Sequence, residues 1–346
     1  MSDFPRLFSP LSLGRLTLAN RVTMAPLFLG YARPTGEVSP LILKHYREMG
    51  ASGAGLVVAE NAAVAPEGLG SPFTLRVDGR QYLAGLKQLA QAIKDGGAAA
   101  SLQLNHAGRF AWQEEPLAPS AVPAGNKTPR ALTQEEIARI VQAFAAGAAL
   151  VKEAGFDAVE LHGGTGYLLA QFLSPRTNRR EDAYGGSFEN RTRLLREVVA
   201  AVRGVWPERL ALFVRLSATD WVEGGWNLEQ SVDLAKTLKT LGVDLVDCST
   251  GGLVPRAEIP LGPGYQVPFA ARIRAEAGLA TGAVGLITAP VQAEDILAQG
   301  SADLVLLGRE LLRDPRWPLH AAQALQAEVP WPASYARAAR GPVPLR

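Results

Sequence analysis

Eight short runs rich in valine, isoleucine and leucine recur along the 346-residue chain, and stretches with helical periodicity lie between them. Most runs are continuous rather than alternating, as expected for parallel strands that are buried on both faces. Eight strands that alternate with helices are the number needed to close a (β/α)8 TIM barrel, and an open doubly wound sheet is the alternative. The expected strands are residues 21–25, 55–60, 99–104, 157–161, 211–216, 243–248, 283–287 and 303–307.

The clearest expected helix covers residues 133–154. Thr133 and Glu136 form a capping box, in which each side chain accepts the backbone N–H of the other residue. Gly155 stands where a helix commonly ends in a left-handed residue. This segment therefore predicts one complete helix between the third and fourth strands.

The remaining segments predict how the barrel is closed and extended. Residues 4–17 precede the first strand and are expected to cap the barrel bottom. The proline-rich segment 110–132 and the segment 164–187 are expected to be long functional loops. Residues 331–346, rich in proline and arginine, are expected to form a C-terminal arm. We expect one domain over residues 1–346, because barrels of this size are commonly single domains.

Composition excludes several classes of protein. The chain is 47% hydrophobic and 20% charged, which is typical of a globular protein. Its one cysteine, Cys248, excludes an internal disulfide and an iron–sulfur cluster, which needs about four cysteines. A cysteine-based zinc site is disfavoured as well, so no metal is expected.

Charge and hydropathy disfavour nucleic acid and membranes as partners, and the cytoplasm is the expected location. The net charge is +2 and no long run of like charges occurs, which disfavours nucleic acid or an anionic membrane as partner. No apolar run reaches the roughly 18 residues that a membrane-spanning helix needs. The first ten residues lack the pattern of a signal peptide.

Catalytic residues of a barrel enzyme are expected where the strands end, at the C-terminal face. No lysine stands at any of these ends, which disfavours a lysine-dependent aldolase. The polar residues found there are Glu60, Asn61, Gln103, Asn105, His106, Arg109, His162, Thr165, Tyr167, Arg215, Ser249, Thr250, Arg309 and Glu310.

Two arginines stand out among these residues. Gly308 and Arg309 follow the eighth strand, where barrels often bind phosphate, although a tight turn with a surface arginine is the alternative. Arg215 lies inside a buried strand and needs a partner. That partner is either a barrel glutamate in a structural ion pair or an electron-rich cofactor.

His162 and Tyr167 follow the fourth strand and are flanked by glycines, which leave space for a ligand. Imidazole and phenol groups can polarise a carbonyl and deliver a proton, although a structural histidine and a packing tyrosine are the alternatives. From the residues alone, the chain is a barrel oxidoreductase or lyase with a phosphorylated ligand.

These residues also carry a resemblance to a known family. The segment 160–193, ELHGGTGYLLAQFLSPRTNRREDAYGGSFENRTR, resembles the signature of the Old Yellow Enzyme family of FMN-dependent ene reductases. The segments NRVTMAP at 20–26, LQLNHAGR at 102–109 and LFVRLSATD at 212–220 are similar to it too, and the match continues in order to Pro315. PGYQVPFA and the terminal tyrosine and arginine look most like the thermophilic-like bacterial subgroup.

The resemblance implies a flavin enzyme with ping-pong kinetics. FMN lies in the barrel mouth, NADPH or NADH reduces it, and flavin N5 passes hydride to an electron-poor alkene of an enone, enal, maleimide or nitroalkene. Oxidative demethylation, nitro-ester reduction and a flavin-binding protein with little turnover are the alternatives.

The resemblance also assigns roles to residues. His162 and Thr165 bind the substrate oxygen, and Tyr167 donates the proton. Gln103 binds the polar edge of the flavin ring, and Arg215 stabilises charge near its N1–C2 side. The other positions similar to flavin-binding residues are Ala25, Pro26, Leu27, Phe28 and Asn61 around the ring, and Gly285, Gly308 and Arg309 at the phosphate.

Two further positions concern the substrate and the assembly. Tyr31 is similar to a substrate-contacting tyrosine. Arg337 resembles a C-terminal arginine that reaches the site of a neighbouring subunit, which implies a homodimer or homotetramer.

The sequence departs from the family pattern at two positions. Thr165 stands where the family has histidine or asparagine, and threonine offers a single short donor, so we expect weaker or shifted substrate binding. Phe28 stands where the subgroup has a cysteine near the flavin, and we expect an altered flavin potential of either sign.

Overall fold

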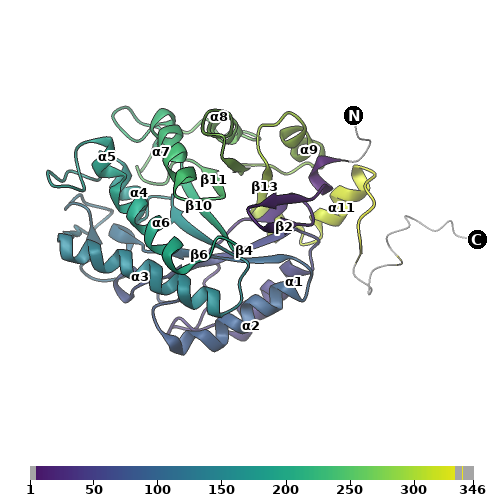
Figure 1. The fold of residues 1–346 in the computed structure, drawn as a ribbon, viewed down its shortest axis with the longest axis horizontal. Helices are drawn as coiled ribbons and strands as arrows, with labels where there is room; N and C mark the ends of the chain where they lie inside the picture. Colours follow the sequence, from purple (N-terminus) through teal and green to yellow (C-terminus); the bar gives the residue numbers. More distant parts are fainter. Residues whose placement is uncertain (1–4, 332–336, 338–346) are drawn as a thin grey trace, which may run out of the picture.

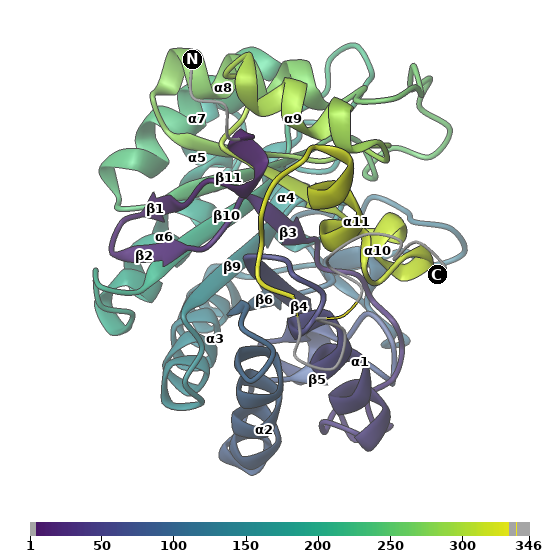
Figure 2. The same ribbon diagram turned by 90° about the vertical axis from the view of Figure 1, so that its right-hand side faces the viewer.

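The structure is a computed structural model that describes residues 5–331 and Arg337. A closed barrel of parallel strands forms its centre (Figures 1 and 2). β13 pairs with β3, and β3 pairs with β4, which joins the two ends of the sheet. The barrel strands are β3 (Val22–Met24), β4 (Leu56–Ala63), β6 (Ala99–Asn105), β9 (Ala158–Gly163), β10 (Ala211–Ser217), β11 (Leu245–Ser249), β12 (Ala280–Ala283) and β13 (Leu304–Leu307). The predicted (β/α)8 barrel is therefore confirmed, and the open sheet is excluded.

Helices surround the barrel and connect its strands. The longer ones are α1 (Pro40–Gly50), α2 (Leu83–Lys94), α3 (Gln134–Glu153), α6 (Arg193–Val205), α7 (Leu228–Thr240), α8 (Val267–Ala277), α9 (Pro290–Ala298) and α11 (Trp317–Ala324). Short helices are α4 (Leu168–Leu173), α5 (Phe188–Arg191) and α10 (Arg309–Arg313). Single 3-10 turns are η1 (Arg6–Phe8), η2 (Pro66–Gly68), η3 (Arg80–Tyr82) and η4 (Gly108–Phe110). No helix in the described part of the chain is long and apolar enough to cross a membrane.

The capping box that predicts α3 is present. The Glu136 amide donates to the Thr133 hydroxyl at 3.2 Å, and the Thr133 amide donates to the Glu136 carboxylate at 2.8 Å. Gly155 follows the helix with a φ of +88°, a left-handed conformation that glycine adopts without strain. Helix and strand β9 thus follow each other with only a short turn between them.

The lower half of the barrel interior is apolar. Residues near the N-terminal ends of the strands form one buried cluster, which includes Leu56, Ala158, Ala211, Leu245 and Leu304. The hairpin of β1 (Leu11–Leu13) and β2 (Leu16–Leu18), purple in Figure 2, adds Leu13 and Leu18 to this cluster. The expected cap at the barrel bottom is therefore confirmed as an antiparallel hairpin.

The seventh strand is not where the sequence pattern predicted it. The prediction was 283–287, whereas β12 covers Ala280–Ala283. Gly278 ends α8 in a left-handed conformation, so the strand can start almost at once. Gly285 and Leu286 both have positive φ, +118° and +51°, and turn the chain out of the sheet. The apolar run after Ala283 is therefore a loop at the barrel mouth.

The segment 110–132 contains short elements rather than a plain loop. β7 (Leu117–Ala118) and β8 (Arg130–Ala131) pair in parallel outside the barrel. On the loop that follows β4, β5 (Leu75–Arg76) pairs with the end of that strand. β5 and the pair of β7 and β8 all lie on segments that follow barrel strands. They therefore extend the C-terminal face of the barrel.

Candidate active site

Polar side chains replace the apolar cluster in the upper half of the barrel. Gln103 of β6 lies opposite Glu160 of β9, and its amide nitrogen donates to the Glu160 carboxylate at 2.8 Å. Arg215 of β10 lies opposite His162 of β9 and Asp247 of β11. Four neighbouring strands therefore bring these side chains into one layer below the barrel mouth.

Arg215 forms an ion pair with a buried carboxylate. Its guanidinium donates to Asp247, and the two side chains are 14% and 0% exposed. Burial lowers the pKa of Arg215, but the charges of Asp247 and Glu160 more than offset this effect and raise it. The sequence left two partners open, a barrel glutamate or an electron-rich cofactor, and the structure gives a protein partner that is an aspartate, with Glu160 nearby. Arg215 is thus a paired cation whose position is fixed at the barrel mouth.

Glu160 is a second buried carboxyl group of this layer. Burial and the charge of Asp247 raise its pKa, although Arg215 and Gln103 act in the opposite direction. Burial raises the pKa of Asp247 as well, and Arg215 opposes this effect. The raised pKa values favour retention of a proton by the two carboxyl groups, which keeps the buried cluster with Arg215 close to neutral.

His162 and Tyr167 lie together at the end of β9. Their rings meet edge to face, with centroids 5.1 Å apart. Burial, together with the charge of Arg215, holds the pKa of His162 well below its usual value, so the imidazole is neutral. Its buried Nδ1 has no hydrogen-bond partner in the described part of the chain. Burial raises the pKa of Tyr167, so the phenol keeps its proton.

Thr165 lies between them on a strained turn. Its φ is +55°, and its backbone N–H donates to the Ser217 hydroxyl at 2.9 Å. The loop after β11 lies against its backbone, since a Cβ on Gly252 would come within 2.8 Å of the Thr165 Cα. The Thr165 side chain is exposed at the mouth of the barrel.

The loop after β3 forms another wall. Ala25 is buried and its N–H donates to Leu307 of β13 at 2.9 Å, whereas Phe28 and Tyr31 are exposed. The Leu29 N–H donates to the buried Glu60 carboxylate at 3.2 Å. Glu60 lies within a register shift between Ala59 and Ala62 in the pairing of β4 with β6. Its carboxylate therefore anchors the loop that carries Phe28.

The other residues assigned to the cofactor lie on the same rim. Pro26, Leu27 and Asn61 belong to these two segments, and Asn61 is buried in β4 beside Glu60. A Cβ on Gly308 would lie 3.5 Å from a Leu27 methyl group. The end of β13 and the loop after β3 are thus in direct contact.

Glycine and arginine line the end of the site near β12 and β13. A Cβ on Gly285 would come within 2.8 Å of the Gln266 amide, so only glycine fits there. Arg309 is exposed and forms no ion pair with any described residue. A cation without a partner beside glycine backbone is suited to bind a phosphate group.

Buried polar atoms without partners gather at this end of the barrel. They include Thr23 Oγ1, Glu60 Oε1, His162 Nδ1, Asp247 Oδ1 and both amide atoms of Asn105. Buried polar groups in folded proteins are nearly always hydrogen-bonded. Their concentration on the inner face of the mouth fits a polar ligand ring there, with its phosphate toward Arg309.

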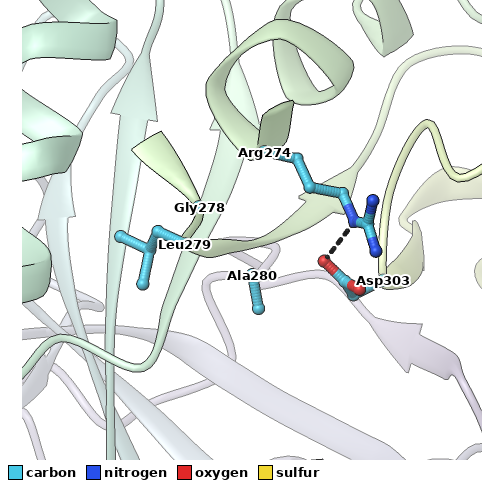
Figure 3. A pocket seen from close by; sticks show the side chains of 5 residues that line it. All are labelled: Arg274, Gly278, Leu279, Ala280 and Asp303. Carbon is cyan, nitrogen blue, oxygen red and sulfur yellow. Dashed lines mark hydrogen bonds and ion pairs between the residues drawn. The ribbon is translucent and has the colours of Figure 1, made fainter. Parts of the chain in front are cut away.

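The opposite end of the barrel has a different character. A depression beside the start of β12 is lined by Arg274, Gly278, Leu279, Ala280 and Asp303 (Figure 3). Arg274 Nε donates to Asp303 Oδ2 at 2.9 Å, so its charge is already paired. The described residues contain no group of three metal-ligating side chains that could hold a metal ion.

Three side chains of the candidate site were not singled out from the sequence. Glu160 and Asp247 are carboxylates inside buried strands, and the reasoning applied to Arg215 would have identified them. Phe110 lies with its ring centroid 6.4 Å from that of Tyr167, a contact without a sequence signal. Arg337 is exposed, and the residues on either side of it lie outside the described part.

Fold and site together define a (β/α)8 barrel whose C-terminal face is suited to bind a phosphorylated cofactor. A family model described as NADH:flavin oxidoreductase / NADH oxidase family matches residues 6–328. An NADPH dehydrogenase of Halalkalibacterium halodurans is 46% identical over 336 residues, which are 96% of this chain and 98% of the relative. An NADPH dehydrogenase of Bacillus subtilis is 42% identical over the same shares.

Solved structures agree with this assignment. Morphinone reductase in complex with tetrahydroNAD superposes with a TM-score of 0.80 at 30% identity, covering 96% of this chain and 94% of that chain. A 2-naphthoyl-CoA reductase complex has a TM-score of 0.88 at 29% identity and covers 92% of this chain. The chain spans about half (52%) of the length of that reductase.

The chain therefore belongs to the NADH:flavin oxidoreductase family, which is the Old Yellow Enzyme family. It is an NAD(P)H-dependent oxidoreductase whose cofactor is FMN, with NADPH or NADH as the reductant.

Proposed function

We propose that the chain is an ene reductase that transfers hydride from NAD(P)H to activated carbon–carbon double bonds with ping-pong kinetics. The observation that supports this proposal best is the pair of His162 and Tyr167, two neutral donors whose rings are in contact at the barrel mouth. Bound FMN supplies the hydride carrier. The protein's own residues bind the substrate oxygen and hold the proton.

His162 binds the substrate oxygen in this proposal. A neutral imidazole whose Nδ1 has no partner is free to donate a hydrogen bond to a carbonyl or nitro oxygen. Such a bond strengthens as negative charge develops on that oxygen. The exposed hydroxyl of Thr165 is the second donor, placed on the same loop.

Tyr167 holds the proton for the α-carbon. Burial raises its pKa, so the phenol is protonated at every pH at which the enzyme is expected to work. Tyr167 lies beside His162, which binds the substrate oxygen. The phenol proton would therefore lie close to the α-carbon, which is bonded to the carbonyl or nitro group.

The residues around the mouth would hold FMN. Gln103 has one amide oxygen left to bind the polar ring edge, since its nitrogen already donates to Glu160. Arg215 would place a positive charge near the N1–C2 side of the ring. The remaining residues of this proposal are Ala25, Pro26, Leu27, Phe28 and Asn61 at the ring, and Gly285, Gly308 and Arg309 at the phosphate.

The proposal includes the assembly and the surroundings of the site. Tyr31 contacts the substrate, and Arg337 completes the site of a second subunit in a cytoplasmic homodimer or homotetramer. One catalytic domain covers residues 1–346, and residues 331–346 form its C-terminal arm. The domain therefore supplies Tyr31 to its own site, and its arm supplies Arg337 to the site of the second subunit. Tyr31 and Arg337 are both exposed, as contacts with a substrate or a second subunit require.

An anaerobic absorbance experiment tests the reaction. NADPH is added to the purified holoenzyme, followed by 2-cyclohexenone. Flavin bands that bleach with NADPH and return with the enone support ene reduction. Bands that return only with oxygen contradict it and direct attention to nitro esters as substrates.

A further inference from the structure

A row of three aromatic rings leads from the buried end of the site to solvent. The Tyr167 ring lies edge to face with His162 at 5.1 Å and with Phe110 at 6.4 Å between centroids. His162 is buried, Tyr167 is partly exposed, and Phe110 is 37% exposed. A substrate whose oxygen reaches His162 therefore passes Tyr167 and extends toward Phe110.

The position of Phe110 relative to Tyr167 is fixed by Gln171. The Arg109 N–H donates to the Gln171 side-chain oxygen at 3.1 Å, and the Gln171 amide nitrogen donates to the Gly166 carbonyl at 2.7 Å. Gln171 is fully buried, so these bonds are shielded from water. One side chain thus joins the segment after β6 to the loop after β9.

The ring of Phe110 also rests on a cation. The Arg109 guanidinium carbon lies 5.0 Å from the ring centroid, and Arg109 Nη2 donates to the Leu253 carbonyl at 2.5 Å. A buried guanidinium held in this way orients the ring before any ligand arrives. Little side-chain freedom is left to lose when a ligand contacts the ring.

Further contacts bring a second loop to the same place. The Trp112 N–H donates to the Leu69 carbonyl at 2.7 Å, and a Cβ on Gly70 would lie 3.9 Å from the Tyr167 hydroxyl. Trp112 itself is 62% exposed. The exposed rings of Phe110 and Trp112 thus belong to one short segment, and Phe110 is the residue of this segment whose ring contacts Tyr167.

We propose that Phe110 is a specificity-determining residue that favours activated alkenes whose double bond is conjugated with an aromatic ring. This inference rests on the proposed ene reduction and adds the substrate class to it. An aromatic substituent can meet the exposed part of the Phe110 ring edge to face or in an offset stack, which an alkyl group cannot. Phe110 contacts the substrate and takes no part in proton or hydride transfer.

Two enones that differ in one substituent test the inference. 4-Phenyl-3-buten-2-one carries a phenyl group where 3-penten-2-one carries a methyl group. We expect Phe110→Leu to lower kcat/KM for the phenyl compound about threefold to tenfold, mainly through KM, and to leave the methyl compound almost unchanged. Phe110→Tyr keeps the aromatic ring and should keep the wild-type preference. Equal losses for both enones in Phe110→Leu would overturn the inference.

A binding measurement decides the question without turnover. 4-Phenyl-2-butanone and 2-pentanone, the two saturated products, are titrated into the oxidised holoenzyme and followed by the flavin absorbance. Phe110→Leu should raise the Kd of the phenyl ketone only, and an unchanged ratio of the two Kd values contradicts the inference. If NADPH bleaches the flavin and neither enone restores it, the ene-reductase proposal fails while the Kd ratio still tests Phe110.

The variants need a check on folding. FMN content per chain and the melting temperature should equal those of the wild type, since Phe110 is partly exposed. Should the leucine variant lose FMN, Phe110→Met keeps an unbranched apolar side chain and repeats the comparison.

Discussion

The imidazole of His162 and the phenol of Tyr167 lie edge to face, with ring centroids 5.1 Å apart and an angle of 83° between their planes. Both groups are neutral, because burial lowers the pKa of His162 and raises the pKa of Tyr167. A neutral histidine can bind an oxygen while the tyrosine keeps its proton for the adjoining carbon. The chemistry proposed for the site depends on this pairing.

Removal of the Tyr167 hydroxyl separates the two half-reactions. Tyr167→Phe should lower the rate of enone reduction about 10²–10⁴-fold, because proton donation by a placed group typically contributes that much. Reduction of the flavin by NADPH needs no proton from Tyr167 and should change little. Stopped-flow absorbance measures each half-reaction, and equal loss in both would show that Tyr167 has a structural role.

Thr165→Asn should strengthen substrate binding. Asparagine tolerates a positive φ better than threonine does, and its amide supplies a longer donor to the substrate oxygen. A hydrogen bond with better reach than that of the threonine hydroxyl is expected to raise kcat/KM for 2-cyclohexenone by about tenfold. Thr165→Val, which keeps the shape and removes the hydroxyl, is the matched control and should lower it. A lower kcat/KM in Thr165→Asn would contradict the role given to this position.

Glu60 predicts a pH-dependent stability of the apoprotein. Burial raises its pKa to about 7 although the amides of Leu29 and Gly30 oppose this effect. The folded protein therefore binds this proton more tightly than the unfolded chain, whose carboxyl has a pKa near 4.5. The resulting stabilisation is complete below about pH 4.5 and is lost as the pH rises to about 7, by on the order of 3 kcal/mol.

Glu60→Gln removes this proton equilibrium. The free energy of unfolding, measured by urea titration of the apoproteins between pH 5 and 8, should fall more steeply in the wild type than in Glu60→Gln. Parallel curves would show that Glu60 ionises in the folded state as it does in water.

Arg215 and Asp247 form a buried ion pair, in which the charge of each residue is stabilised by the charge of the other. Arg215→Met leaves Asp247 buried without a cation and should lower the free energy of unfolding by about 3–5 kcal/mol. The double variant Arg215→Met/Asp247→Asn removes both charges and should recover part of that loss. Urea unfolding of the apoproteins checks both, and no recovery in the double variant would contradict the assignment of this pair.

Much of the fold could be predicted because its signals are local. The capping box of Thr133 and Glu136 and the glycine at 155 define α3 from its own sequence. β12 was misplaced because the turn at Gly285 and Leu286 depends on backbone conformations that an apolar run does not reveal. The apolar pattern extends through both segments, 280–283 and 283–287, so the pattern alone does not show which of them is the strand.

The site was predictable where residue type and strand position decide it. Arg215, His162 and Gln103 could be placed at strand ends, and the structure brings them into one layer. The contact between Phe110 and Tyr167 could not be predicted, since it joins two segments through the buried amide of Gln171. The positive φ of Thr165, a residue against which the loop after β11 lies, likewise has no sequence signal.

Isotope labelling tests the central claim most directly. In one reaction, the enzyme reduces 2-cyclohexenone with unlabelled NADPH in D2O. In the other, it uses NADPH deuterated at the transferable hydride in H2O. NMR then locates the deuterium in each product. The account predicts solvent deuterium at the α-carbon only and NADPH deuterium at the β-carbon only. Solvent deuterium at the β-carbon, or no transfer of the NADPH label, would contradict hydride delivery from NADPH to the alkene.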